Sequence, residues 1–174
     1  MPARVVVVEY DQDWPILFEE EMRRILEAIG HKVSAVEHIG STAVPGLGAK
    51  PIIDMMAGIP GEREAGECIP LLRGIGYTSV TPHPEDPDNY YCLGKGPHSV
   101  GYHLHLVRFR SAAWDDHLLF RDYLRSHPDA VRRYYRLKRR LAAQYGSERG
   151  AYTESKTSFI KSIISEARKS SSLP

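Results

Sequence analysis

The sequence predicts an α/β fold in which helices flank a β-sheet and a helical segment forms the C-terminal part of the chain. Two patterns indicate this class. Through residue 109, short apolar runs bounded by turn residues alternate with segments of helical periodicity, and beyond that point the pattern is helical. At 174 residues, without an internal repeat or a linker, the chain fits one domain, expected to span residues 1–174.

Strands are expected where a short run rich in Val, Ile, Met or Tyr lies between turn signals. The first of these runs, RVVVVEY, has the composition of a buried strand. The last three runs are separated by the turn-rich stretches TPHPEDPD and GKGPHS. The sequence therefore predicts strands at residues 4–10, 33–39, 52–59, 76–81, 89–94 and 100–109.

The first helix is predicted to follow the N-terminal strand and to end at Gly30. Its apolar residues recur at the spacing of one helical face, and Pro15 lies in the first turn, where proline is tolerated. A second, less regular helix is predicted at residues 62–75, because Gly66 and Pro70 interrupt its pattern. Both helices connect predicted strands, as the α/β class requires.

The C-terminal helical segment is predicted from Trp114 onward. Two groups of helix-breaking residues divide it into three pieces, one at His127–Pro128 and the other around Gly146–Gly150. The last five residues, SSSLP, are expected to be a frayed tail.

The composition of the chain places it among cytoplasmic globular proteins. The N-terminus reaches acidic residues too early for a signal peptide, and no apolar run approaches the roughly 18 residues of a membrane span. Cys68 and Cys92 have neither the spacing of metal ligands nor the density of a disulfide scaffold. We therefore expect two small buried cysteines in a cytoplasmic protein with no membrane partner.

Charge is divided unevenly along the chain, although the formal net charge is only +1. Residues 1–107 contain 8 basic and 15 acidic residues, whereas residues 108–174 contain 15 basic and 7 acidic ones. This division suggests an acidic half that can hold a metal and a basic half that can hold an anion. Helical surfaces that are simply rich in arginine explain the pattern equally well.

The loop GSTAVPGL follows a predicted strand and has the composition of a phosphate-binding loop. Its glycines allow a ligand to approach the backbone, and free amides with the hydroxyls of Ser41 and Thr42 can surround phosphate oxygens. An ordinary strand-to-helix turn is the alternative. The loop is not of the Walker type, because Lys50 lacks a preceding glycine and is followed by Pro51.

One carboxylate and two imidazoles are predicted on the faces of two strands. Asp54 lies inside the apolar run PIIDMMAGI, where a carboxylate is costly unless it is paired or binds a metal. His103 and His105 alternate with leucines and so share one strand face, from which they can bind a metal or contact phosphate. An aspartate that caps a neighbouring loop is the structural alternative.

Each of the three predicted C-terminal helices places one cation on the apolar stripe that should face the interior. At about 100° per residue, Arg121, Lys138 and Lys156 fall within sectors otherwise occupied by large apolar or aromatic residues. A single long side chain can reach solvent from such a position, but three successive cases are harder to explain this way. Cations near an apolar interior need an anionic partner, either a carboxylate or a bound phosphate.

Together, the run EHIGSTAVPGLGAKPIID, the later HLHLV and the series FRDYLR, Y-x-x-L-K and Y-x-x-x-K resemble the GrpB-like family, also called UPF0157. The resemblance covers residues 4–168. It implies a mixed β-sheet of the nucleotidyltransferase type, with flanking helices and a C-terminal helical segment that closes over the site. Members of the family also occur fused to dephospho-CoA kinase.

The resemblance also implies a site. The nucleotidyltransferase pattern pairs a Gly-Ser motif, matched here by Gly40 and Ser41, with a first carboxylate, matched by Asp54. Met56 stands at the second carboxylate position, and no acidic residue follows on the strand that carries the two histidines. The expected cofactor is a divalent metal, Mg²⁺ or Mn²⁺, with Zn²⁺ ranked behind them. One aspartate with two imidazoles favours a softer ion than Mg²⁺, which disfavours ordinary nucleotidyl transfer.

The leading interpretation is a nucleotidyltransferase-like protein, leaning to a divergent metal-dependent enzyme, that binds or transfers a nucleotide or another phosphorylated small molecule. The predicted site residues are the phosphate-binding Gly40, Ser41 and Thr42, the clamping cations Arg121, Lys138 and Lys156, the additional contacts His38 and Lys50, and the catalytic and metal-binding Asp54, His103 and His105.

Two alternatives stay open. The first is a non-catalytic module that binds a nucleotide or phosphate, for which no metal is needed. The second is a nucleic-acid-binding protein that uses the basic half, which we rank last because most of that charge is expected to form a solvated face. The sequence does not predict an oligomeric state.

Overall fold

The structure is a computed structural model that describes residues 5–96 and 101–171. Its centre is a five-stranded sheet in the order β1-β2-β5-β4-β3. The central pair, β2 and β5, is parallel, and every other neighbouring pair is antiparallel, so the sheet is mixed. The strands are β1 (Ala35–Ile39), β2 (Ile52–Ile59), β3 (Ser79–His83), β4 (Asp86–Lys95) and β5 (Gly101–Arg108).

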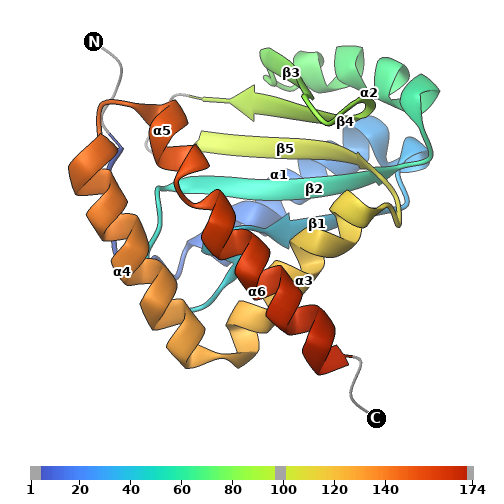
Figure 1. The fold of residues 1–174 in the computed structure, drawn as a ribbon. Helices are drawn as coiled ribbons and strands as arrows, with labels where there is room; N and C mark the ends of the chain where they lie inside the picture. Colours follow the sequence, from blue (N-terminus) through green and yellow to red (C-terminus); the bar gives the residue numbers. More distant parts are fainter. Residues whose placement is uncertain (1–4, 97–100, 172–174) are drawn as a thin grey trace.

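Helices cover both faces of this sheet (Figure 1). Helices α1 and α2 lie behind the sheet in that view, whereas the C-terminal helices lie to its left and in front, with α6 crossing it. The helices are α1 (Trp14–Ile29), α2 (Glu62–Gly74), α3 (Ala112–Ser126), α4 (Pro128–Tyr145), α5 (Arg149–Glu154) and α6 (Thr157–Ser171), with short 3₁₀ turns at Gly30–Lys32 and Ser41–Ala43. No described helix is both long and apolar enough to cross a membrane.

The predicted α/β class is confirmed, and so are its first two helices. Helix α1 ends where Gly30 follows it, as expected. Helix α2 forms in spite of Pro70, because a buried stripe of Ala65, Cys68 and Leu72 packs it onto the core behind the sheet. Cys68 is buried as predicted, whereas Cys92 is only half-buried. Burial of an apolar face thus outweighs an unfavourable residue within the helix.

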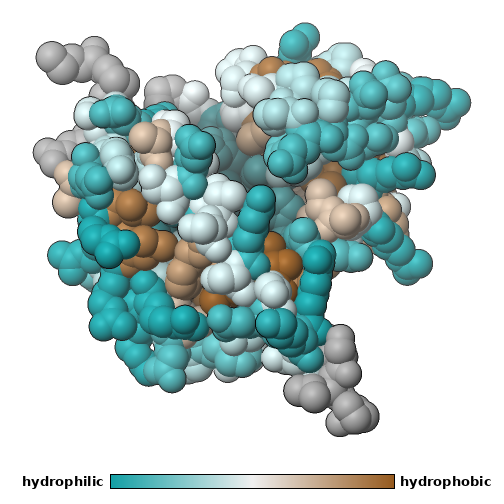
Figure 2. Space-filling model, in the orientation of Figure 1, coloured by the Kyte–Doolittle hydropathy of each residue, from teal (hydrophilic) through white to brown (hydrophobic). Residues whose placement is uncertain are grey.

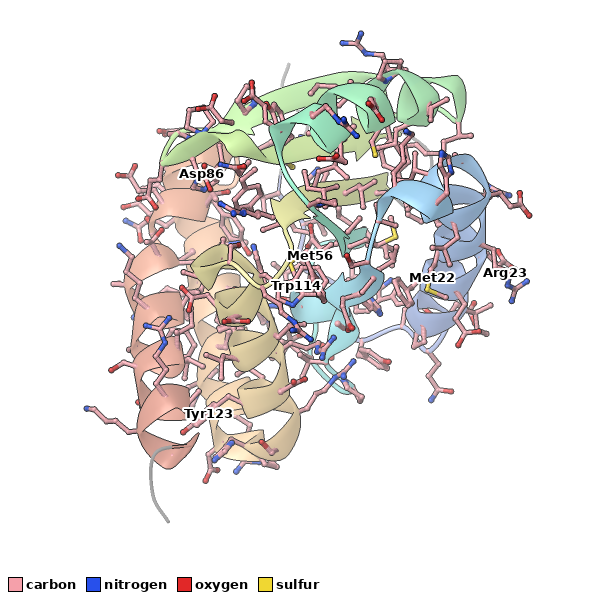
Figure 3. All side chains as sticks on the ribbon, turned by 90° about the vertical axis from the view of Figure 1, so that its right-hand side faces the viewer. Met22, Arg23, Met56, Asp86, Trp114 and Tyr123 are labelled. Carbon is pink, nitrogen blue, oxygen red and sulfur yellow. The ribbon has the colours of Figure 1, made fainter. Side chains whose placement is uncertain are left out.

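Strand alternation divides the apolar core from the predicted site. The side chains of Ile53 and Met55 belong to the core packed against α1 and α2. Asp54 and Met56, between and beside them on β2, therefore point to the opposite face. There Met56 is fully buried against Trp114 of α3, and the two lie close together in Figure 3.

The expected N-terminal strand is wrong for the described residues 5–10. Its only strand-like contact is an isolated bridge between Val8 and Ala49, and the side chain of Val6 is 57% exposed. The amide of Val5 instead donates to the carbonyl of Gly146 at the end of α4. The run of valines therefore joins a loop to a helix end and does not enter the sheet, where both of its faces would have been buried.

Two other boundaries differ from the prediction. The C-terminal segment has the expected breaks before Pro128 and after Tyr145, but a further turn at Ser155–Lys156 separates α5 from α6, giving four helices in place of three. The stretch TPHPEDPD is mostly strand, because β3 continues to His83 and β4 begins at Asp86. The expected tail SSSLP begins within α6, and its last three residues lie outside the described part of the chain.

Candidate anion-binding site

A cavity of about 250 Å³ lies between the site face of the sheet and the helices that follow β5. We call it the lysine cavity. Eight of the predicted site residues line it: Ser41, Thr42, Lys50, Asp54, His103, His105, Lys138 and Lys156. These residues come from the loop after β1, from β2 and β5, and from α4 and the turn after α5, so the fold assembles segments that are far apart in the sequence.

Three lysines from three different segments converge on this cavity. Lys138 is only 2% exposed, and its amine donates to the carbonyl of Gly48 and lies 4.8 Å from the centre of the Tyr134 ring. The amines of Lys156 and Lys50 lie 4.4 and 5.2 Å from the centre of the Tyr152 ring. Within the described residues, none of the three forms an ion pair with a carboxylate.

Burial and mutual repulsion act on these amines together. Burial, followed by the charge of Lys156, lowers the pKa of Lys138 to about 7, although Asp54 opposes the shift. Burial, followed by the charge of Lys50, lowers the pKa of Lys156 to about 8. The pKa of Lys50 is lowered as well, mainly by burial. The cavity therefore has an excess of positive charge that its one carboxylate does not neutralise.

Asp54 is that carboxylate, and it is held by the two predicted histidines. Its Oδ1 lies 3.3 Å from Nδ1 of His103 and 3.8 Å from Nε2 of His105. Burial alone would raise the pKa of Asp54, but the two neighbouring imidazoles of His103 and His105 hold it well below its usual range. The parallel register explains the contact, because Asp54 is paired with His103, and Met56 with His105. Asp54 is therefore ionised.

The Gly-Ser loop closes one side of the site. Gly40 has a φ of +70°, a conformation that other residues rarely adopt, and a Cβ there would lie 2.9 Å from Oδ2 of Asp54. Ser41 and Tyr134 both line a second cavity next to the first. A glycine is therefore required at the point where the loop touches the carboxylate.

Two predicted residues lie away from the lysine cavity. His38 shares the register of Met55, and so faces α1, where it stacks on Phe18 at 4.6 Å. Its Nε2 lies 3.0 Å from the hydroxyl of Thr42, and burial lowers its pKa to about 4, which keeps it neutral. His38 thus holds the loop in place from the opposite side of the sheet.

Arg121 is the other residue that the structure separates from the site. Its guanidinium pairs with Glu37 at 2.6 Å and with Asp122 at 2.7 Å, and it also donates to the carbonyl of His38. Of the three interior cations, Arg121 therefore has carboxylate partners. Lys138 and Lys156 have none within the described part of the chain.

Sequence reasoning missed the aromatic residues of the site. Tyr134 and Tyr152 each precede a site lysine by four residues, which places ring and amine on the same side of the chain. The repeated Tyr-x-x-x-Lys spacing was the signal for both. Tyr152 is fully buried, and its hydroxyl has no hydrogen-bond partner among the described residues.

The predicted metal is not supported by the arrangement of donors. In residues 5–96 and 101–171, no group of three or more His, Cys, Asp or Glu side chains is placed to hold a metal ion. His103 and His105 direct ring nitrogens at Asp54, and Met56 supplies no oxygen. A divalent cofactor stays a prediction, and we assign no step to it.

Comparisons with known proteins agree with these motifs. A model of the family described as GrpB protein matches residues 4–166. A UPF0157 protein of Pseudomonas aeruginosa is 37% identical over 166 residues, which cover 94% of this chain and 68% of that protein. The crystal structure of the conserved protein GrpB from Enterococcus faecalis has a TM-score of 0.83 at 34% identity, covering 95% of this chain and 98% of that one.

One relative is a longer protein that this chain matches only in part. A protein of Mycolicibacterium paratuberculosis, named dephospho-CoA kinase, is 27% identical over 188 residues, and the match covers 95% of this chain but only 46% of that protein. The family match extends over nearly the whole chain and confirms the resemblance predicted from the motifs. This chain is therefore a member of the GrpB family.

Proposed function

We propose that this chain binds the phosphate group of a nucleotide or of another phosphorylated small molecule in the lysine cavity. One observation carries the proposal: the buried Lys138 and the half-buried Lys156 have no carboxylate partner among the described residues, and neighbouring lysines lower the pKa values of their amines further. A buried charge without a partner destabilises the fold by roughly several kcal/mol. A bound anion would offset this cost. A phosphate, with two negative charges, supplies that partner.

Other features of the cavity favour phosphate. The hydroxyls of Ser41 and Thr42 line it beside the lysines and can donate to phosphate oxygens. The Gly40–Ser41 loop lies beside Asp54, as in the nucleotidyltransferase pattern. We therefore propose that the fold is of the nucleotidyltransferase type. The name of the longer relative, dephospho-CoA kinase, adds support for a nucleotide-related role.

A second candidate is transfer of the bound phosphoryl or nucleotidyl group, and His103 favours it. Asp54 fixes the imidazole through Nδ1, which leaves Nε2 to act as a base, and the His103 side chain is 42% exposed. A substrate hydroxyl would lose its proton to Nε2 while its oxygen bonds to phosphorus and the bond from phosphorus to the leaving oxygen breaks. Met56, buried against Trp114, cannot supply the second carboxylate of ordinary nucleotidyl transfer.

Isothermal titration calorimetry tests the binding function directly. Pyrophosphate and ATP would be titrated into the wild type and into Lys138→Met, with and without Mg²⁺ or Mn²⁺. We expect binding that weakens at least tenfold in Lys138→Met and is unchanged in Lys161→Met, a matched change at an exposed position of α6. Equal affinity in wild type and Lys138→Met would refute the proposal.

Turnover is tested separately from binding. If transfer occurs, His103→Gln should abolish release of pyrophosphate from ATP in the presence of an acceptor and leave ATP affinity within about threefold, because His103 acts on the attacking group. A wild type that binds ATP but releases nothing with or without a metal would favour the non-catalytic module.

A further inference from the structure

A second cavity, of about 470 Å³, opens directly beside the lysine cavity. The two share the walls formed by Ser41, Asp54, His105, Thr153 and Lys156, so one ligand can extend from one into the other. Figure 2 shows the surface hollowed between the C-terminal helices and the part of the molecule formed by β3, β4 and α2. The volume is within the range of small-molecule sites.

One wall of this second cavity is apolar. Ile39 of β1, Phe120 of α3 and Ile160 and Ile164 of α6 line it, and Tyr134 continues the wall toward the lysines. These side chains belong to or pack against the same hydrophobic clusters that hold the helices on the sheet. The wall is thus a fixed apolar surface that can cover one side of a flat group.

The facing wall is aromatic and held rigidly. The hydroxyl of Tyr90 lies 2.8 Å from Nδ1 of His105 and 2.9 Å from Nε2 of His117, which ties three rings from β4, β5 and α3 together. His83 stacks on Tyr90, with ring centres 4.3 Å apart and planes only 9° from parallel. Because these rings are already ordered, stacking of a ligand ring against them costs little additional side-chain entropy.

Charge reverses sign from one cavity to the other. Glu85, Asp86 and Asp116 line the second cavity, and Lys156, the one lysine or arginine that the described residues contribute to its walls, is shared with the lysine cavity. Asp86 accepts from Asn89 at 3.1 Å, and Asp116 pairs with Arg168, so each carboxylate keeps further acceptor sites. In Figure 3, Asp86 lies on the same side of the molecule as α3 and α6. Carboxylate oxygens with unused acceptor sites favour a ligand that carries amino groups.

We infer that the second cavity binds a planar, amino-bearing heteroaromatic ring that belongs to the same ligand as the phosphate in the lysine cavity. This inference rests on the proposed function and narrows its substrate class to nucleotides with an amino-bearing base. The aromatic and apolar walls would enclose the ring, the carboxylates would accept from its amino group, and the opposite charges of the two cavities would fix its direction.

Titration of the wild type with a set of related ligands tests the phosphate, the ring and the amino group separately. The wild type would be titrated with pyrophosphate, ribose 5-phosphate, AMP, CMP and GMP, and with IMP and UMP as matched bases that carry an oxo group in place of the amino group of AMP and CMP. We expect at least one amino-bearing nucleotide to bind tenfold or more tightly than ribose 5-phosphate, and its oxo counterpart to lose at least threefold of that gain.

Two variants locate the effect. Ile160→Trp fills the second cavity, so it should remove the tenfold preference and leave pyrophosphate affinity unchanged, whereas Lys161→Trp, at the exposed neighbouring position, should change neither. Tyr90→Phe keeps the ring and removes the hydroxyl that orders His105 and His117, and should reduce the preference several-fold even if Ile160→Trp does not fold.

The outcomes distinguish this inference from the proposed function. If pyrophosphate binds through Lys138 but every nucleotide binds no better than ribose 5-phosphate, the second-cavity inference is wrong and the phosphate site stands. An Ile160→Trp variant that is folded and keeps the full preference would also overturn it. Adenosine and cytidine, titrated as the phosphate-free counterparts of AMP and CMP, test the other part: if they bind as tightly as the nucleotides, the proposed phosphate function is wrong instead. Binding of none of these compounds would overturn both.

Discussion

Buried charged side chains on the two faces of the sheet differ in their partners. On the face covered by α1 and α2, Glu21 is 1% exposed and meets the amine of Lys95 at 2.7 Å, the phenol of Tyr77 at 3.1 Å and the guanidinium of Arg24 at 3.4 Å. On the other face, Lys138 is 2% exposed and meets a backbone carbonyl and an aromatic ring.

The two charges are buried to the same extent and differ in their pairing. Glu21 is neutralised within the protein, so it needs nothing further to be stable where it is. Lys138 and its neighbours are neutralised only in part, by Asp54, and lower each other's pKa values. Equal burial therefore predicts opposite consequences when the two residues are replaced.

The largest effect should come from Glu21→Ala. The change leaves Lys95 and the hydroxyl of Tyr77 without their shared partner, and breaking a buried ion pair costs about 3–5 kcal/mol. Urea denaturation measures the loss, with Glu20→Ala, an exposed position on the same helix, as the control. A loss of less than about 1 kcal/mol, within the range of an exposed pair, would mean that Glu21 is not neutralised as we describe.

Lys138→Met should act in the opposite direction. Replacing an incompletely paired buried charge by an apolar side chain of similar length is often neutral or stabilising by about 1–4 kcal/mol. We therefore expect a free energy of unfolding, without ligand, that equals or exceeds that of the wild type, together with the loss of pyrophosphate binding. Destabilisation comparable to that of Glu21→Ala would erase the contrast between the faces.

Gly40→Ala tests the contact between the loop and Asp54. Gly40 and Gly46 both have positive φ angles, of 70° and 79°, but a Cβ at Gly46 meets nothing within 4 Å. Backbone strain of this kind costs about 1–3 kcal/mol in either variant. The excess loss of stability in Gly40→Ala over Gly46→Ala, read from thermal unfolding, isolates the contact with Asp54, and equal losses would show that the contact is unimportant.

The smallest effects should appear in the dependence on pH. The pKa values of Lys138 and Lys156, about 7 and about 8, lie below the 10.5 expected of an unfolded lysine. Between these limits the unfolded chain binds more protons, so the contribution of these lysines to stability rises with pH. Affinity for sulfate, whose charge is constant over this range, should instead fall as pH rises from 6.5 to 9. Lys138→Met should flatten both dependences, and parallel slopes in wild type and variant would contradict the assignment.

Much of the fold followed from local patterns. The α/β class, the end of α1, the bounds of β2 and the break before Pro128 depend on residues that are near in sequence, and the structure confirms them. The predicted N-terminal strand was wrong because strand composition does not reveal whether a sheet edge is available. Residues 5–10 lie against a loop and the end of α4 instead. The turn between α5 and α6 lacked a glycine or proline signal and was missed.

The sequence by itself determined that His103 and His105 share one strand face opposite their neighbouring leucines, since strand alternation is a local property. It also placed Arg121, Lys138 and Lys156 on interior stripes. Only the tertiary structure decided their partners, because Glu37 lies 84 residues before Arg121, and Gly48 lies 90 residues before Lys138. Helical periodicity fixes the direction of a side chain, but what it meets there depends on how distant segments pack. Packing gave Arg121 two carboxylate partners and left Lys138 and Lys156 without one among the described residues.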